Sequence, residues 1–218
     1  MFDEIVKTIY PDRCEVLEIV PSHHYVYPIF KNGSSSLHKE QKSQKWNSVF
    51  DRDIGLIDVP ITVFLRDPKD RFISGVNTFV QQTLRDNPKL DRDTIMFFVQ
   101  KYLFLNRHYI PQFFWLVNLS RFTNQPLVFK DMTEVSDLTI YNSRAGIIPP
   151  DEQFLTDVAD FPWGALELYF FLDNLLLSRI GQTITFSEIL SDFKQRFADQ
   201  YTTVFQRTFA LIDGMPKT

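Results

Sequence analysis

The stretch Tyr25-Val26-Tyr27-Pro28-Ile29-Phe30-Lys31-Asn32-Gly33-Ser34-Ser35-Ser36-Leu37 joins an apolar, β-prone run to a short polar turn. The turn carries a lysine, a glycine and consecutive serines, and the pattern predicts a helix after it. A strand, a tight turn and a helix N-terminus direct backbone N–H groups and partial positive charge to one point. The stretch therefore predicts a phosphate or sulfate site, although an ordinary β-to-α turn also favours Asn-Gly and serines for backbone reasons.

A second stretch has the same design: Ile61-Thr62-Val63-Phe64-Leu65-Arg66-Asp67-Pro68-Lys69-Asp70-Arg71-Phe72-Ile73-Ser74. Its β-branched and aromatic run ends at Arg66, where Asp67 suits a helix N-cap and Pro68 the first helical position. Arg66 is thus expected at the carboxyl end of a strand, where open α/β sheets bind ligands. The alternative for Arg66 is an exposed ion pair with a neighbouring aspartate, which contributes little energy.

Taken together, the two stretches resemble the sulfotransferases that use 3′-phosphoadenosine 5′-phosphosulfate (PAPS). In that family, a strand–loop–helix with a Lys-x-Gly-[Ser/Thr]-[Ser/Thr] core holds the 5′-phosphosulfate. An Arg-[Asp/Asn]-Pro motif, followed by a serine on the next helix, binds the 3′-phosphate. The resemblance implies these nucleotide-binding residues, of which Asn32 departs from the commoner Ser or Thr: Lys31, Asn32, Gly33, Ser34, Ser35, Ser36, Arg66 and Ser74.

Two further stretches extend the resemblance to about residues 20–135. Asn106–Gln112 is similar to the His-aromatic-x-Pro-Gln signature of the carbohydrate sulfotransferase branch. Gln125–Met132 resembles a later strand that often ends in Glu-Asp-Leu, with Lys130 in place of the acid. The fold that this implies is α/β, with a three-layer, P-loop-like parallel sheet flanked by helices.

The chemistry implied by the family is transfer of a sulfuryl group from PAPS, as co-substrate, to a hydroxyl or amine, with a carbohydrate as the expected acceptor. Lys31 fits the cation on the leaving phosphate, and the scheme requires no metal. His108 is the candidate general base, because an imidazole titrates near neutrality; its alternative role is to hold the turn at Pro111. Other candidates for the base lie between the two phosphate motifs: His38, Glu40, Asp51, Asp53 and Asp58.

Periodicity and capping signals predict the secondary structure. The expected strands are Glu15–Val20, Tyr25–Phe30, Ile61–Leu65 and Leu127–Lys130, with Phe113–Val117 undecided between strand and helix. The expected helices are Phe2–Ile9, Ser35–Lys45, Pro68–Leu84 and Thr94–Leu105. After about Asp151 the chain is expected to be all helical, with a capping box at Thr185–Glu188. We expect one sulfotransferase-like domain: a nucleotide-binding α/β core over 1–148 and a helical C-terminal part over 149–218.

Composition is compatible with one such domain. The chain has 218 residues, 44% hydrophobic residues and 22 phenylalanines, enough to bury a sizeable core. A net charge of −4 argues against general nucleic-acid binding, although Arg66, Lys69 and Arg71 form a local basic cluster. The single cysteine, Cys14, excludes an internal disulfide and is expected to be a buried structural thiol.

No segment of the sequence is typical of a membrane span. Ala165–Leu177 is apolar but short, and Glu167 and Asp173 interrupt it, so a core helix is expected there. The N-terminus has no apolar signal core. These features predict a cytoplasmic protein without a membrane partner and give no indication of oligomeric state. Because eukaryotic carbohydrate sulfotransferases usually carry an N-terminal membrane anchor, the resemblance implies a bacterial or viral origin.

The acceptor itself does not follow from the sequence. Trp46, Trp115 and Trp163 could stack on sugar rings or lie in the core, and residues 37–58 are expected to form a substrate-facing loop. One alternative function is a non-catalytic nucleotide-binding protein that has lost its base. Another is a P-loop-type kinase, for which the order of Lys31 and Gly33 is reversed.

Overall fold

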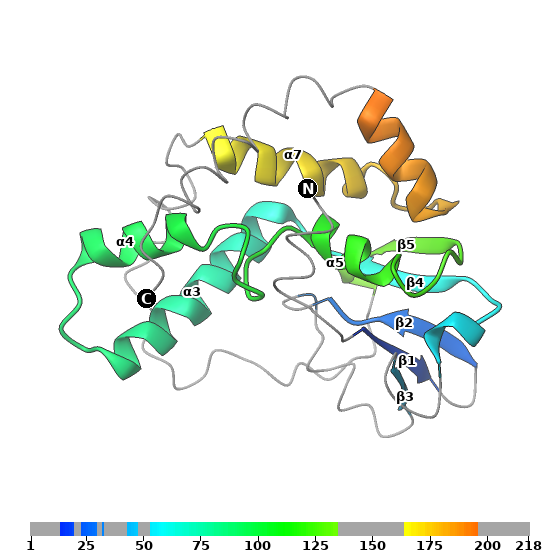
Figure 1. Ribbon diagram of the computed structural model, residues 1–218, viewed down its shortest axis with the longest axis horizontal. Helices are drawn as coiled ribbons and strands as arrows, with labels where there is room; N and C mark the ends of the chain where they lie inside the picture. The colour runs from blue at the N-terminus through cyan, green and yellow to red at the C-terminus, as the bar shows by residue number, and fades with distance from the viewer. Residues whose placement is uncertain are drawn as a thin grey trace.

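The computed structural model describes residues 14–19, 23–29, 32, 43–47, 53–134 and 164–195 (Figure 1). Among these residues, six strands form one sheet in the order β3-β1-β2-β4-β5-β6. In chain order the strands are β1 (Glu15–Ile19), β2 (His24–Tyr27), β3 (Ser43–Asn47), β4 (Ile61–Leu65), β5 (Leu127–Asp131) and β6 (Thr183–Ile184).

The sheet is mixed rather than parallel. Strands β2, β4 and β5 run parallel, whereas β1, β3 and β6 pair antiparallel with their neighbours. The expected parallel sheet is therefore confirmed only for the central three strands. The physical reason is clearest for β1 and β2, because the chain between Ile19 and His24 is too short for the crossover that parallel strands require.

The helices are α3 (Pro68–Asp86), α4 (Arg92–Lys101), α5 (Gln112–Leu119) and α7 (Gly164–Leu177), with 3₁₀ turns η1 (Ile54–Leu56) and η2 (Met132–Glu134) and a further helical run over 186–195. Helix α3 begins as expected, since the Asp67 carboxylate accepts a 2.9 Å bond from the Asp70 N–H and Pro68 follows the cap. The capping box is also confirmed: Thr185 N donates to Glu188 Oε2, and Glu188 N donates to Thr185 Oγ1.

The main core lies between one face of the sheet and the described helices. Alternate residues of β4, namely Ile61, Val63 and Leu65, are buried in it together with apolar residues of α3, α5 and α7. Leu17 and Val26 centre a second, small cluster on the opposite face, to which no described helix contributes. The described residues thus give an α/β fold with helices on one face, and the three-layer arrangement stays a prediction.

Several expected elements differ from the structure. Residues 43–45 belong to strand β3, not to a helix over Ser35–Lys45, because they pair with β1 in the register Leu17↔Lys45. The undecided segment is helix α5, whose eight residues are all buried and so show no periodicity. The all-helical C-terminal part is wrong at β6, which pairs with β5. The expected helix Phe2–Ile9 and residues 35–42 lie outside the described part of the chain.

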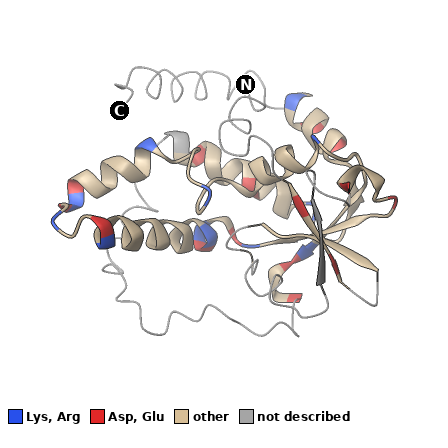
Figure 2. Ribbon diagram, turned by 60° about the horizontal axis from the view of Figure 1, so that its bottom comes forward, with Lys and Arg blue, Asp and Glu red and all other residues tan. Residues whose placement is uncertain are grey.

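Smaller predictions concern Cys14, membrane spans and charge. Cys14 is buried, as expected, and burial raises the pKa of its thiol to about 12. Within the described ranges, no helix is long and apolar enough to cross a bilayer. Lys, Arg and the acidic residues lie near the ends of α3 and α4, whereas α5 carries no charged residue and α7 only Glu167 and Asp173 (Figure 2).

Helix α3 lies in backbone contact with the segment before α5. A Cβ atom on Gly75 would overlap the carbonyl oxygen of His108 and lie 2.6 Å from the Cβ of Tyr109. The segment cannot easily retreat, because Tyr109 N and Ile110 N both donate to the Asn106 carbonyl. Only glycine therefore allows this approach of helix and loop.

We expect Gly75→Ala to lower the free energy of unfolding by about 1 kcal/mol or more. The overlap costs about 1–3 kcal/mol, which exceeds the gain of up to about 1 kcal/mol in helix propensity. Urea denaturation measures the change. Gly55→Ala is the matched control, because a Cβ there meets its nearest atom at 3.4 Å. Equal effects of the two substitutions would contradict the close packing.

Candidate functional site

The carboxyl ends of the parallel strands define the candidate site. Strands β4 and β5 end side by side in the register Leu65↔Asp131, and β2 lies next to β4 on its other side. Because parallel strands end at the same edge of a sheet, the turns after β2 and β4 converge there. Asn32 lies in the first of these turns, and Arg66 is the residue directly after β4.

Asn32 ties the turn after β2 to the end of β4. Its backbone N–H donates to the Ile29 carbonyl at 3.1 Å, which closes the turn. Its side-chain Nδ2 donates to the Phe64 carbonyl at 2.8 Å and also to Gln112 Oε1. The residue is only 1% exposed, so these bonds are shielded from water.

Gln112, the first residue of α5, links this turn to Arg66. Its Oε1 accepts from Arg66 N at 3.0 Å, and its Nε2 donates to the Arg66 carbonyl at 2.9 Å. The side chain therefore pairs with the backbone of residue 66 as a neighbouring strand would. Three segments that the sequence singled out thus meet at one buried glutamine, which is 0% exposed.

The two residues expected to bind the 3′-phosphate lie at the strand end and on the helix that the sequence predicted for them. Arg66 follows β4 and is half-buried, and Ser74 is half-buried on α3. Arg71, in contrast, is 0% exposed and is not part of a surface basic cluster. Its guanidinium donates to the Ile110 carbonyl at 2.5 Å and to the Tyr169 hydroxyl at 3.0 Å. The Arg71 guanidinium therefore forms its hydrogen bonds inside the protein core.

The expected 5′-phosphosulfate residues other than Asn32 lie outside the described residues: Lys31, Gly33, Ser34, Ser35 and Ser36. The same holds for three candidates for the general base: His38, Glu40 and Asp51. Of the remaining two, Asp53 caps η1 by accepting from Gly55 N at 2.9 Å, and Asp58 is exposed. For all of these residues the functional assignment stays a prediction.

His108 lies against α3 rather than in the Gln112 network. Its backbone N–H donates to Asn106 Oδ1 at 2.9 Å, and its carbonyl faces Gly75, the neighbour of Ser74 on α3. The side chain is half-buried. The structure thus brings His108 to the helix that carries Ser74, and its role as base stays a prediction.

The three tryptophans that are candidates for an acceptor site differ in what the structure shows of them. Trp115 is 6% exposed and belongs to the main core, and its carbonyl accepts from the Tyr27 hydroxyl at 2.9 Å. The surroundings of Trp115 therefore support a role in the core. Trp46 lies on strand β3, and Trp163 falls outside the described residues.

Sequence analysis missed Asp173, which completes the network from α7. Its Oδ1 accepts from Phe113 N at 3.1 Å and its Oδ2 from Gln112 Nε2 at 3.2 Å. Pro111 offers no side chain to cap α5, so the Asp173 carboxylate caps that helix from another part of the chain. A carboxylate inside an apolar helix was the available signal, because such groups are rarely buried without partners.

Burial is the main influence on the Asp173 carboxylate. It raises the pKa of Asp173, whereas the Arg71 charge and the hydrogen bonds from Gln112 and Phe113 act in the opposite direction. Asp173, Arg71 and Tyr169 are each 0% exposed. The network therefore holds both a carboxylate and a guanidinium in the core, where removing either would leave the other poorly compensated.

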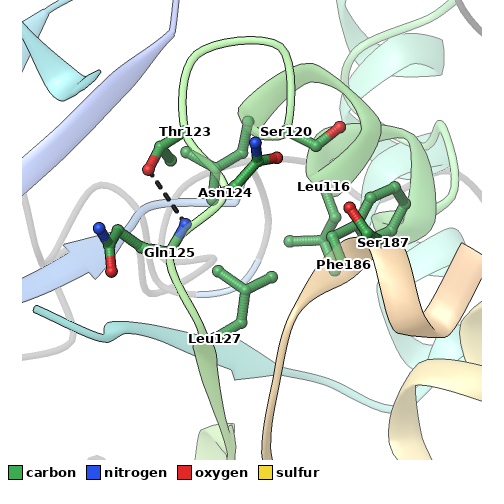
Figure 3. Close-up of a pocket in the computed structure, with 9 residues that line it drawn as sticks. Leu116, Ser120, Thr123, Asn124, Gln125, Leu127, Phe186 and Ser187 are labelled. Carbon is green, nitrogen blue, oxygen red and sulfur yellow. Dashed lines mark hydrogen bonds between the residues drawn. The ribbon is translucent and has the colours of Figure 1, made fainter. Parts of the chain in front are cut away.

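A small recess lies elsewhere, at the amino end of β5 (Figure 3). It is lined by Leu116, Leu119, Ser120, Thr123, Asn124, Gln125, Leu127, Phe186 and Ser187. Leu127 is the first residue of β5, so the recess opens at the edge of the sheet opposite to Arg66. Two of its polar groups form local hydrogen bonds: Thr123 Oγ1 accepts from Gln125 N at 3.2 Å, and Ser120 Oγ donates to the Val117 carbonyl at 2.9 Å. It is separate from the candidate site.

Comparison with known proteins gives no relative: no protein-family model, curated protein or solved structure matches the chain.

The raised pKa of Asp173 leads to a pH-dependent prediction for Asp173→Asn. A group whose pKa is higher in the folded protein stabilises the fold fully below its unfolded pKa, and this contribution is lost as pH rises through the folded pKa. The stability advantage of the wild type over Asp173→Asn should therefore be larger at about pH 4 than at about pH 8. Urea denaturation at both pH values measures it.

Asp91→Asn provides a control of opposite sign. Hydrogen bonds from Thr94 lower the pKa of Asp91, the N-cap of α4, so its contribution is present at neutral pH and lost in acid. For that variant the advantage of the wild type should grow with pH. The same trend at Asp173 would mean that Arg71 outweighs burial and would contradict the assignment.

Proposed function

We propose that the chain is a PAPS-dependent sulfotransferase that acts on a hydroxyl or amine acceptor, with a carbohydrate as the favoured class. The observation that carries the proposal is the linkage made by Gln112 between Asn32 and Arg66. In the family that the sequence resembles, the motifs of these two residues bind opposite ends of one nucleotide. The convergence of the two motifs at one edge of the sheet supports the proposal that they bind one nucleotide.

The proposed reaction forms a bond from the acceptor oxygen or nitrogen to sulfur and breaks the bond from sulfur to the 5′-phosphate oxygen of PAPS. The acceptor proton passes to a base, for which His108 is the candidate. Charge develops on the departing phosphate, where Lys31 and the serines after it would stabilise it. The second product is adenosine 3′,5′-bisphosphate (PAP).

Arg66 is the residue on which recognition of the 3′-phosphate depends in this proposal. The N-terminus of the 19-residue helix α3 adds partial positive charge beside it. Asp67 partly cancels that charge, because its carboxylate accepts a hydrogen bond from the Asp70 N–H at the start of the helix. The guanidinium, which can bind a phosphate through two parallel hydrogen bonds, is therefore the stronger of the two attractions.

Ligand-dependent thermal denaturation tests the nucleotide. A ligand at a hundred times its dissociation constant adds about 2.7 kcal/mol of apparent stability. PAP should raise the melting temperature, whereas AMP, which lacks the 3′-phosphate, should do so far less. Arg66→Ala should abolish most of the difference between PAP and AMP. Arg85→Ala is the matched control, because Arg85 is an exposed arginine at the other end of α3.

The outcomes separate the three candidate functions. Equal responses to PAP and AMP would argue against a 3′-phosphate site. PAP binding without turnover on any acceptor would favour the non-catalytic nucleotide-binding protein. Magnesium-dependent ATP hydrolysis without any response to PAP would favour the kinase.

We expect His108→Gln to reduce turnover at least about 100-fold while the affinity for PAP stays unchanged, because a base acts on the proton and not on the nucleotide. Glutamine keeps the size and polarity of the side chain but cannot accept a proton near neutral pH. Steady-state kinetics and PAP titration measure the two effects. Near-normal turnover would remove His108 from the mechanism and leave it a role in the turn before Pro111.

A further inference from the structure

Gln112 has every hydrogen-bonding position of its side-chain amide in use. Its Oε1 accepts from Arg66 N and Asn32 Nδ2, and its Nε2 donates to the Arg66 carbonyl and to Asp173 Oδ2. An amide has two acceptor positions and two donor hydrogens, so all four are satisfied. One side chain therefore bonds to the turn after β2, to the end of β4 and to α7 at the same time.

Its partners allow only one orientation of this amide. The Arg66 N–H requires an acceptor, which is Oε1, and the Arg66 carbonyl and Asp173 Oδ2 both accept from Nε2. A flip of the amide would place Nε2 against two donors and Oε1 against two acceptors. Gln112, Asn32 and Asp173 are all buried, so a mismatch could not be relieved by water. The backbone of Arg66 and the side chains of Asn32 and Asp173 thus together select the orientation in which Gln112 holds Arg66 and Asn32 together.

Asp173 is itself held by the start of α5. Phe113 N donates to its Oδ1, and Phe113 follows Gln112 in the same helical turn. The helix, the glutamine and the carboxylate therefore form one rigid unit. That unit binds the backbone of residue 66 and the side chain of residue 32.

We infer that Gln112 is a positioning residue that places the two halves of the nucleotide site relative to each other, with Asp173 helping to fix its orientation. The inference rests on the proposed function, since it concerns how the 5′ and 3′ ends of one nucleotide are bound together. A ligand that carries both phosphates requires both halves at the correct separation. Loss of Gln112 should therefore weaken binding of PAP more than binding of AMP.

Gln112→Glu and its combination with Asp173→Asn test this inference. Glutamate keeps the acceptor for Arg66 N but places a carboxylate oxygen against both the Arg66 carbonyl and the Asp173 carboxylate, which lose their donor. In the double variant, the amide introduced by Asp173→Asn could again donate to position 112 while its oxygen accepts from Phe113 N. We expect Gln112→Glu to weaken PAP binding at least about 10-fold and AMP binding about 3-fold or less, with the double variant recovering part of the loss, because the Arg66 carbonyl still lacks its donor.

The kinetic counterpart is a split between KM and kcat. With saturating PAPS, kcat of Gln112→Glu should fall less than the apparent affinity for PAPS, because the reacting groups themselves are unchanged. Gln81→Glu is the control, since Gln81 is a half-buried glutamine on α3 that bonds to Asn77 at 2.9 Å, away from the strand ends. It should leave PAP and AMP binding unchanged.

A milder pair of variants covers the case in which Gln112→Glu does not fold. Asn32→Ala removes the side-chain bonds to Gln112 and to the Phe64 carbonyl and leaves the bonds between Gln112 and the Arg66 backbone intact. Combined with Arg66→Ala in a double-mutant cycle, it should show non-additive losses of PAP affinity, because the two residues act through Gln112. Additive losses, or equal losses of PAP and AMP affinity in Gln112→Glu, would overturn the positioning role while PAP binding by the wild type still supported the proposed function. Absence of PAP binding by the wild type would overturn both.

Discussion

The pairing of the Gln112 side chain with the backbone of Arg66 is the interaction on which the candidate site depends. Strand β4 ends at Leu65, and beyond that residue the sheet no longer holds the chain. Gln112 replaces the missing strand partner, because its Oε1 accepts from the Arg66 N–H and its Nε2 donates to the Arg66 carbonyl. Because the same amide also binds Asn32, the turn after β2 and the end of β4 have a fixed spacing. A site for a ligand with two charged ends needs that spacing before it needs any particular side chain.

Beneath this interaction lies a buried charged network whose desolvation is costly. Asp173 and Arg71 are both fully buried, and in proteins such groups contribute little net stability unless each is well hydrogen-bonded. Here the N-terminus of α5 binds the carboxylate, and the Ile110 carbonyl and the Tyr169 hydroxyl bind the guanidinium. An apolar core could be as stable, but it would offer no acceptor to the second Nε2 hydrogen of Gln112 or to the Phe113 N–H. The network thus relates to the orientation of the Gln112 amide as well as to stability.

The sequence predicts the β4–α3 unit almost to the residue, because strand end, N-cap and proline are consecutive and each acts locally. It does not predict α5, because all eight residues of that helix are buried and show no periodicity. It does not predict the edge strand β3 either, because the polar sequence of that strand is equally compatible with a helix and only the pairing with β1 makes it a strand. Arg66 and Ser74 follow from a local motif. Asp173 does not, since its partners Gln112 and Phe113 lie far away in the chain and only tertiary structure brings them together.

The contact at Gly75 has a mechanical consequence. Where a helix touches another backbone without an intervening side chain, the two segments cannot rotate or slide past each other without atomic overlap. Helix α3 and the residues at 108 and 109 must therefore travel as one body in any rearrangement that accompanies ligand entry. Ser74 and His108 would keep their mutual placement throughout such a motion, so adjustment to an acceptor of a different shape would have to come from other parts of the chain.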